Sequence, residues 1–305
     1  MTPTTASRPP AAVTGAAALL SSDPDQVRDL PWGAAHALFD ASPRLAAIMT
    51  REDLDDWLDC SLLHYPVLNA MRGATPVPPQ DLTRTMTVSG DARGGYADGA
   101  KVRAQLRAGA TVVVQNLHEW HRPAREVCRR AAELFEAKVG AVAFWSPPGE
   151  AGLRVHRDDG HLFVVQICGT KRWYLYDTPA APGLWEPGYV ADPAELGEPT
   201  TVDVRAGQVL YLPDGIAHHT ETLDEESVHV TLAVREPALR DIAELAVRAA
   251  LARVPAHATA GGSFADREEA VGTVLDNLAT ALGRVDRTAL TRHVTRRAVE
   301  ARGSR

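Results

Sequence analysis

The sequence predicts a mainly β protein, a barrel or sandwich with helical additions before and after it. The main observation is a change of pattern: residues 140–234 form short apolar segments broken by Gly, Pro and Asp, whereas helical periodicity precedes and follows them. Many short strands at this spacing are typical of barrels and sandwiches. A chain of 305 residues, 45% of them hydrophobic, can form one large domain with an appendage, or two modest domains.

Composition and charge narrow the class of protein. The net charge of -7 gives no overall electrostatic footprint for nucleic acid, so a nucleic-acid partner is not expected. No apolar run approaches the roughly 20 residues of a membrane helix, so no membrane association is expected either. Cys60, Cys128 and Cys168 lie far apart without a CxxC pair, which indicates a reducing cytoplasm. The Ala/Pro/Thr-rich residues 1–25 are expected to be a disordered tail.

Helices and turns are expected ahead of the strand-rich region. Residues 26–58 have a helical pattern, with Thr50 as an N-cap and Asp53 completing a capping box. Residues 89–99, SGDARGGYADG, are glycine-rich and are expected to form a flexible loop. The other elements expected here are a turn-rich connector at 72–81, a helix at 101–108, a strand at 111–115 and an amphipathic helix at 124–139.

Seven strands are expected in the central region, and one more is expected to begin at His218. The seven are GAVAFWS (140–146), LRVHRD (153–158), HLFVVQIC (161–168), KRWYLYD (171–177), TVDVR (201–205), QVLYLP (208–213) and SVHVTLAV (227–234). Together with the helices around them, they predict a barrel domain with an N-terminal helical elaboration over residues 26–236.

The C-terminal residues 237–305 are expected to be a helical appendage, with helices at 237–254, 265–282 and 287–302. Apolar residues fall along one face of each of the first two helices. They are Leu239, Ile242, Leu245 and Ala249 in one, and Val271, Val274, Leu275, Leu278 and Leu282 in the other. These faces must be covered by the barrel, by a second subunit, or by both. The arginine-rich last helix is expected to present a solvated face rather than to bind nucleic acid.

A candidate metal site begins at HRD, residues 156–158. Alternate side chains of a strand share a face, so His156 and Asp158 point the same way while Arg157 points the opposite way. One imidazole and one carboxylate are two thirds of the 2-His-1-carboxylate triad that holds non-haem Fe(II) and leaves positions open for substrate and O2. Taken alone, this motif also fits a surface or capping histidine.

The third ligand is expected from AGQVLYLPDGIAHH, residues 206–219. This segment reads as a Gly turn, an apolar strand, a Pro-x-Gly corner and then a histidine at the start of the next strand. In a double-stranded β-helix such a corner brings a late strand beside an early one. His218 is therefore the candidate ligand, and His219 is the alternative if the register shifts by one residue.

These segments resemble a known family. Residues 145–177 and 205–219 are similar to the JmjC-type oxygenases of the cupin superfamily, particularly the bacterial ribosomal-oxygenase branch, and weaker likeness extends the resemblance to about residues 49–234. The resemblance implies a jelly-roll, double-stranded β-helix core. It also implies Fe(II) held by His156, Asp158 and His218, with 2-oxoglutarate as cosubstrate and O2 as oxidant. No catalytic residue is expected beyond the metal centre.

Lys171 is the candidate for binding the far carboxylate of 2-oxoglutarate. It begins the strand that returns after the Gly169–Thr170 turn, and the resembling family places a lysine or arginine here. A solvated turn lysine is the alternative, and Arg154 or Arg172 would be the next candidates, although alternation points Arg172 outward.

Three further residues are candidates for the cosubstrate pocket. His229 and Thr231 share a face that should point into the barrel, where they could contact the cosubstrate or form interior hydrogen bonds. Ser146 stands where the family usually has threonine. Where the family usually carries Asn-x-Tyr, this chain has Val142 and Phe144.

Other polar residues near these motifs are given structural roles. Asp159 is expected at the surface, and His161 is expected to be structural or close to substrate. His118 and His121 could mimic a helical metal pair but are expected in a loop with a structural role.

The function expected from these features is that of an Fe(II)/2-oxoglutarate dioxygenase that hydroxylates an amino-acid side chain in a protein or peptide. Hydroxylation of a free amino acid or a natural-product intermediate is an alternative. A non-catalytic metal-binding cupin is an alternative of another class. The resemblance also favours a homodimer formed through the C-terminal helices.

Overall fold

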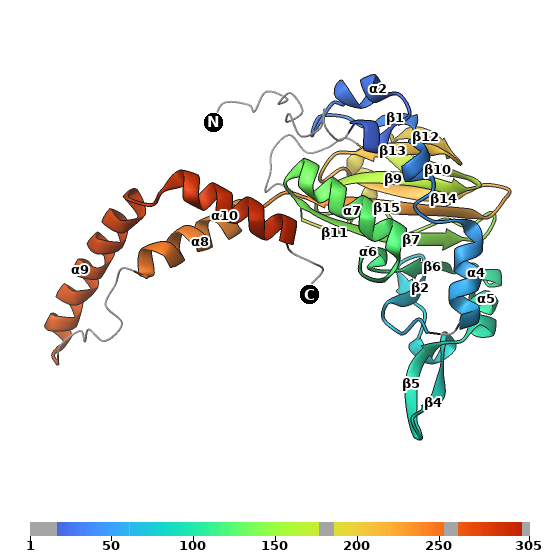
Figure 1. Ribbon diagram of the computed structural model, residues 1–305, viewed down its shortest axis with the longest axis horizontal. Helices are drawn as coiled ribbons and strands as arrows, with labels where there is room; N and C mark the ends of the chain where they lie inside the picture. The colour runs from blue at the N-terminus through green and yellow to red at the C-terminus, as the bar shows by residue number, and fades with distance from the viewer. Residues whose placement is uncertain (1–16, 61, 177–185, 253–261, 301–305) are drawn as a thin grey trace. The chain divides into compact units, whose positions relative to one another are not determined.

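The computed structural model describes residues 17–60, 62–176, 186–252 and 262–300 (Figure 1). The chain forms two compact units, one ending at Arg235 and one spanning Glu236–Ala301. The predicted disordered tail is wrong from residue 17 on, because Leu20 is buried in the core and Ser21 pairs with Ala41 through a β-bridge. The rest of that tail, residues 1–16, lies outside the described residues.

The first unit is built on a large antiparallel sheet, which we call the major sheet. The strand pair β15–β7 runs in continuous register from Ser227 opposite Ser146 to Arg235 opposite Lys138. Both strands are rich in β-branched and small apolar residues, which suit a sheet covered on both faces. The eight strands, in order across the sheet, are β1 (Ala37–Asp40), β13 (Gln208–Leu212), β9 (His161–Cys168), β15 (Ser227–Arg235), β7 (Lys138–Ser146), β6 (Thr111–Val114), β2 (Leu68–Arg72) and β3 (Thr75–Pro76).

A second antiparallel sheet, the minor sheet, faces the major one. The two pack together through one apolar cluster, to which β9 and β13 of the major sheet and β10 and β12 of the minor sheet contribute. Two facing antiparallel sheets of this kind form the expected jelly-roll barrel. The minor sheet consists of β11 (Gly188–Tyr189), β8 (His156–Arg157), β14 (His218–Thr222), β10 (Thr170–Leu175) and β12 (Thr200–Arg205), in that order.

The described α-helices of the first unit precede β7 in the chain, and α7 packs on the outer face of the major sheet (Figure 1). The apolar face of α7, which includes Val127, Cys128 and Ala131, is buried against β7 and β15. This helix ends at Phe135, earlier than predicted, because Glu136 adopts a left-handed conformation with φ of 50°. The helices are α2 (Pro24–Arg28), α3 (Pro43–Ala46), α4 (Arg51–Cys60), α5 (Gly99–Arg107), α6 (Leu117–Trp120) and α7 (Arg122–Phe135), with 3-10 turns η1 (Pro79–Asp81) and η2 (Pro193–Leu196).

The prediction of helix over residues 26–58 is only partly right. The capping box is confirmed, since the Thr50 amide donates to Asp53 and the Asp53 amide donates to the Thr50 hydroxyl, and α4 follows it. Residues 37–40, however, form β1, which pairs with β13 at the edge of the major sheet. Pairing along a sheet edge outweighs local helical propensity for a segment this short.

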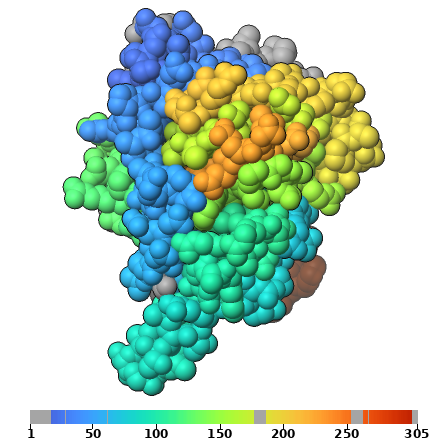
Figure 2. All heavy atoms as spheres, turned by 90° about the vertical axis from the view of Figure 1, so that its right-hand side faces the viewer, coloured from blue at the N-terminus to red at the C-terminus, as the bar shows by residue number. Residues whose placement is uncertain are grey.

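The glycine-rich loop predicted at residues 89–99 is instead half of a β-hairpin. β4 (Thr83–Val88) pairs with β5 (Asp91–Ala97), and the pair stands out from the first unit (Figures 1 and 2). Ser89 and Gly90, with φ of 52° and 88°, form the kind of two-residue turn that requires positive φ at both positions. The loop prediction is wrong because Gly90 supplies the positive φ of a hairpin turn and the residues after it pair as a strand.

The second unit consists of three helices, α8 (Leu239–Leu251), α9 (Phe264–Gly283) and α10 (Arg287–Glu300). These confirm the three predicted helices, although residues 253–254 and 301–302 lie outside the described residues. Several apolar side chains of α8 and α9 are exposed, including Leu239 at 85% and Leu275 at 60%. Within the described ranges, no helix is both long enough and apolar enough to cross a membrane.

Candidate metal centre

His156, Asp158 and His218 come together at one end of the minor sheet. β8 and β14 pair with His156 directly opposite His218, so the two imidazole rings lie on the same face with centroids 4.4 Å apart. The Asp158 Oδ2 atom lies 3.8 Å from Nε2 of His156 and 3.7 Å from Nε2 of His218. The three ligand atoms lie within 4.8 Å of one another, which is close enough to share one metal ion.

Backbone carbonyl groups orient both histidines for metal binding. Nδ1 of His156 lies 2.8 Å from the Arg154 carbonyl oxygen, and Nδ1 of His218 lies 3.1 Å from that of Ile216. A carbonyl oxygen only accepts, so each Nδ1 carries the hydrogen and each Nε2 keeps its lone pair. This is how ligating histidines are usually oriented in metal sites.

The charge state of the cluster also suits a metal ion. Burial lowers the pKa of His218 to about 4, aided by the neighbouring His156, while Asp158 opposes this shift. His218 is therefore neutral at physiological pH, as a metal ligand must be. Two imidazoles and one carboxylate are the donor set that fits non-haem Fe(II), with coordination positions left open.

The alternative ligands lie elsewhere. The His219 ring points to the other face of β14 and stacks on Tyr174, with centroids 4.5 Å apart and planes 6° apart. Asp159 forms an ion pair with Arg235 at 2.9 Å, as a surface residue would. The structure therefore brings neither residue into the cluster.

The other histidines have packing roles. His161 is buried, stacks on Trp32 with centroids 3.9 Å apart, and lies 2.9 Å from the Tyr211 hydroxyl. His118 lies on the short helix α6 rather than in the predicted loop, and its Nδ1 accepts from the Ala141 amide. Nε2 of His121 lies 3.0 Å from the Ile48 carbonyl oxygen, so these two side chains do not form a metal pair.

Lys171 is fully buried inside the barrel, where it projects from the same face of β10 that faces the metal cluster. It is 1% exposed, and its Nζ donates to the Ser146 hydroxyl at 2.8 Å. Ser146 in turn lies 2.9 Å from the hydroxyl of Thr111. In the described part of the chain, no carboxylate pairs with Lys171. Burial lowers its pKa to about 7.

Polar atoms without hydrogen-bond partners gather around this lysine. Of the described residues, five have a buried side-chain nitrogen or oxygen atom that lacks a partner. Four of the five lie around Lys171. Thr222 is its cross-strand neighbour, and Trp173 follows it on the same face of β10. His229 interacts electrostatically with Lys171, and Gln166 donates a hydrogen bond to Ser227, which lies opposite Ser146. Buried polar groups are normally paired, so this concentration indicates a space that a polar ligand completes.

β15 and β7 supply the facing wall of this space. His229 is 3% exposed and stacks on Phe144, with centroids 4.8 Å apart and planes 11° apart. The ring of Phe144 thus occupies a position where the resembling family usually has a polar residue. Thr231 is also buried and lies two residues along the same strand.

Sequence reasoning missed Trp173, Thr222, Gln166 and Thr111. The signal for two of them was present, because strand alternation places Trp173 on the face of Lys171, and Thr222 on the face of His218. Gln166 and Thr111 could be assigned only once the pairing of β9, β6 and β7 was known.

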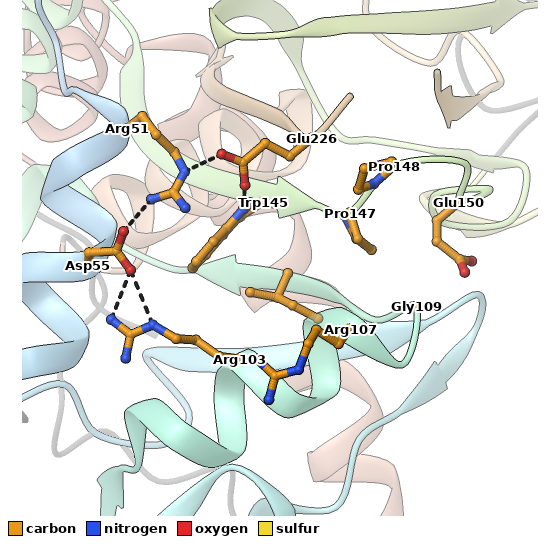
Figure 3. Close-up of a pocket in the computed structure, with 11 residues that line it drawn as sticks. Arg51, Asp55, Arg103, Arg107, Gly109, Trp145, Pro147, Pro148, Glu150 and Glu226 are labelled. Carbon is orange, nitrogen blue, oxygen red and sulfur yellow. Dashed lines mark hydrogen bonds and ion pairs between the residues drawn. The ribbon is translucent and has the colours of Figure 1, made fainter. Parts of the chain in front are cut away.

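A cavity of about 380 Å³ lies away from the metal cluster, on the outer side of the major sheet (Figure 3). It is lined by parts of α4, α5, the end of β7 and the loop before β15. Arg51 joins Asp55 to Glu226 across the cavity, and the Trp145 indole also donates to Glu226. Because these charged groups bind one another, the cavity does not by itself select a ligand.

Comparisons with known proteins agree with this geometry. The profile of the JmjC domain matches residues 116–242. The chain is 36% identical over 150 residues to the bifunctional lysine-specific demethylase and histidyl-hydroxylase NO66 of Drosophila sechellia, a match that covers 46% of this chain and 21% of the relative. NO66 of Drosophila yakuba is 39% identical over 114 residues, 36% of this chain and 17% of that one. The chain thus spans about a fifth of the length of these curated relatives.

Among solved structures, the X-ray structure of ycfD from E. coli aligns with a TM-score of 0.52 and 15% identity, over 84% of this chain and 68% of that one. At this identity the likeness concerns the fold alone, and it supports the jelly-roll arrangement of the two sheets. The profile match contains all three residues of the metal cluster as well as Lys171. Residues 116–242 of this chain, which hold the metal cluster, therefore match the JmjC domain.

Proposed function

We propose that this protein is an Fe(II)- and 2-oxoglutarate-dependent dioxygenase that hydroxylates an amino-acid side chain in a protein or peptide. One observation carries the proposal: two oriented imidazoles and a carboxylate converge at one end of the barrel, and a buried lysine without a carboxylate partner lies deeper in the same barrel. A dicarboxylate that reaches from the metal to Lys171 would complete both sites.

Different residues of the chain would bind the metal and the cosubstrate. His156, Asp158 and His218 hold Fe(II), and Lys171 binds the far carboxylate of 2-oxoglutarate, a role for which a buried cation is well suited. Ser146 positions the lysine through its hydrogen bond, while His229 and Thr231 line the space between lysine and metal. With O2, iron and 2-oxoglutarate supply the oxidising chemistry, and the protein places the substrate and excludes water.

A protein or peptide substrate is favoured by the relatives, whose names describe a lysine demethylase and histidyl-hydroxylase. A free amino acid or natural-product intermediate is the alternative. The non-catalytic cupin reading is disfavoured by Lys171, because a metal-binding barrel without turnover has no need for a costly buried cation.

Turnover of 2-oxoglutarate tests the proposal. The purified protein is incubated with Fe(II), O2 and 2-oxoglutarate against a panel of peptides and small metabolites, and succinate and a mass gain of one oxygen atom are measured. Succinate together with an oxidised peptide would support the proposal, and an oxidised small metabolite would support the alternative. Absence of succinate under all conditions would contradict both and favour the cupin reading.

We further propose that the protein forms a homodimer through its C-terminal helices. The exposed apolar residues Phe264, Val271 and Leu275 of α9 are the observation in favour, because such surfaces are usually covered by a partner. Light scattering of the full chain and of a chain ending at Arg235 tests this. We expect a dimer and a monomer respectively, and a monomeric full chain would contradict the proposed dimer.

The free cysteines support a cytoplasmic location.

A further inference from the structure

Trp173 occupies the middle of the space between Lys171 and the metal cluster. Lys171, Trp173 and Leu175 alternate along the inner face of β10, and Leu175 pairs with His218 while Lys171 pairs with Thr222. The Trp173 ring lies beside the metal end of this face, since its centroid lies 5.5 Å from that of His218. At about 3.4 Å per residue, the backbone positions of Lys171 and Leu175 are about 13 Å apart. A ligand that joins lysine to metal must therefore pass beside Trp173.

The Trp173 indole nitrogen is buried without an acceptor. The side chain is 3% exposed, and no described group accepts a hydrogen bond from Nε1. Buried tryptophans normally find a partner for this N–H. Trp145 donates to Glu226 at 2.9 Å, and Trp120 donates to the Gln115 carbonyl oxygen at 3.2 Å. Unlike these two tryptophans of the same barrel domain, Trp173 has no acceptor for its indole N–H, and this N–H lies in the space where we propose that the ligand binds.

The type of acceptor follows from the surroundings. Lys171 and the Ser146 hydroxyl already attract negative charge to this space, and the nearest ring on the other side, His229, lies 5.6 Å from the Trp173 centroid. A neutral N–H gains most from an ionised acceptor, because charge-assisted hydrogen bonds are the stronger ones. A carboxylate is therefore the acceptor that best satisfies the indole.

We propose that the Trp173 indole N–H donates a hydrogen bond to a carboxylate oxygen of bound 2-oxoglutarate and is thus a cosubstrate-binding residue. This inference rests on the proposed function and adds a second donor side chain to the one expected at Lys171. In the ligand-free protein the N–H has no acceptor, so removing it breaks no hydrogen bond. Its loss should lower the affinity for 2-oxoglutarate.

Two matched substitutions test the proposal in the full chain loaded with Zn(II), which is redox-inert and supports the same ligand set. Trp173→Phe should weaken 2-oxoglutarate binding in isothermal titration calorimetry by about 10- to 150-fold, the range for one hydrogen bond to a charged group. Its thermal midpoint without ligand should fall only by what the smaller ring loses in packing, because no hydrogen bond is broken there. Trp145→Phe, which breaks a hydrogen bond that is already made, should lower the ligand-free midpoint and leave 2-oxoglutarate affinity unchanged.

The outcomes separate this inference from the proposed function. If Trp173→Phe binds 2-oxoglutarate as the wild type does, the indole does not contact the ligand and the inference is wrong while the function stands. If the wild type itself binds no 2-oxoglutarate, both are overturned.

A second measurement needs no substitution, should Trp173→Phe fail to fold. In the 15N-labelled wild type with Zn(II), adding 2-oxoglutarate should shift one indole N–H resonance strongly and slow its exchange with solvent. Trp173→His, which keeps a ring N–H, should retain part of the affinity. If no indole resonance responds to 2-oxoglutarate, the inference is overturned.

Discussion

The outer cavity and the interior of the barrel differ in how their cations are paired. In the cavity, Arg51 binds both Asp55 and Glu226, and these hydrogen bonds raise the pKa of the guanidinium although burial alone would lower it. Inside the barrel, Lys171 is buried with a hydroxyl as its only hydrogen-bond partner among the described residues, and its pKa is lowered. The paired charges of the cavity thus bind one another, whereas the unpaired lysine is the group that we propose a ligand's carboxylate binds.

The largest expected effect concerns the metal cluster. His218→Ala removes one of three ligands and should abolish metal binding and turnover, measured by Zn(II) titration and by succinate formation with Fe(II). His219→Ala is the matched control, because its ring stacks on Tyr174 outside the cluster, and it should leave most of the metal affinity intact. The reverse pattern would mean that the register of β14 is off by one residue.

Lys171→Met tests whether the unpaired lysine binds a carboxylate of 2-oxoglutarate. It should raise the dissociation constant for 2-oxoglutarate by roughly 10- to 150-fold, since one hydrogen bond to a charged group is lost. Zn(II) affinity should change little. Arg172→Met is the control, because Arg172 faces outward and pairs with Asp203 at 2.7 Å. If Arg172→Met weakens 2-oxoglutarate binding and Lys171→Met does not, the carboxylate site lies elsewhere.

The pH dependence of stability gives a second view of Lys171. The pKa of Lys171 is about 7 in the folded protein, and its ordinary value of 10.5 applies to the unfolded chain. Between these two pH values, Lys171 is therefore protonated in the unfolded state but largely deprotonated in the folded state. The free energy of unfolding of the ligand-free protein should therefore rise with pH from about 7 to about 10.5, with this lysine contributing a slope of up to about 1.4 kcal/mol per pH unit. Below the folded pKa this contribution is flat.

Denaturant titrations of the wild type and Lys171→Met at several pH values measure this contribution. The difference between the two should shrink as pH rises through this window, because the cost of burying the charged lysine disappears. A difference that does not depend on pH would show that Lys171 keeps its ordinary pKa in the folded protein.

The smallest effect is expected at the paired charges. Arg51→Ala loses two ion pairs and a contact over the Trp145 ring at 4.3 Å, and because the side chain is half-buried it should cost about 1–2 kcal/mol of unfolding free energy. Arg93→Ala, whose pair with Asp91 is exposed, should cost less than about 0.5 kcal/mol. Neither should change 2-oxoglutarate affinity; if Arg51→Ala does, the two regions are coupled through Trp145 and Ser146.

The parts of the site that were predictable follow from strand periodicity and local motifs. Alternation placed His156 and Asp158 on one face, and the Pro-x-Gly corner placed His218 near them, without knowledge of any contact. The orphaned donors and acceptors could not be predicted, because whether Trp173 or Gln166 has a partner depends on residues far away in the chain. The resemblance suggested the role that we propose for Lys171, and the structure shows that the side chain is buried.

The fold was predictable where apolar runs were long and uncertain where segments were short. β9 and β15 follow from their sequence, whereas β1 depends on an edge that β13 offers it. The hairpin of β4 and β5 was missed because its glycines serve turn geometry, and Gly95 also makes room for the His64 ring, which a Cβ there would approach to 2.5 Å. Tertiary partners thus decide the short elements.

We propose that one ligand joins the metal cluster to Lys171. Isothermal titration of 2-oxoglutarate into the wild type, with Zn(II) and after chelation of all metal, tests it most directly. We predict tight binding with metal, markedly weaker binding without it, and a further loss in Lys171→Met under both conditions. Equal affinity with and without metal, or no binding at all, would show that no single ligand joins the metal cluster to Lys171.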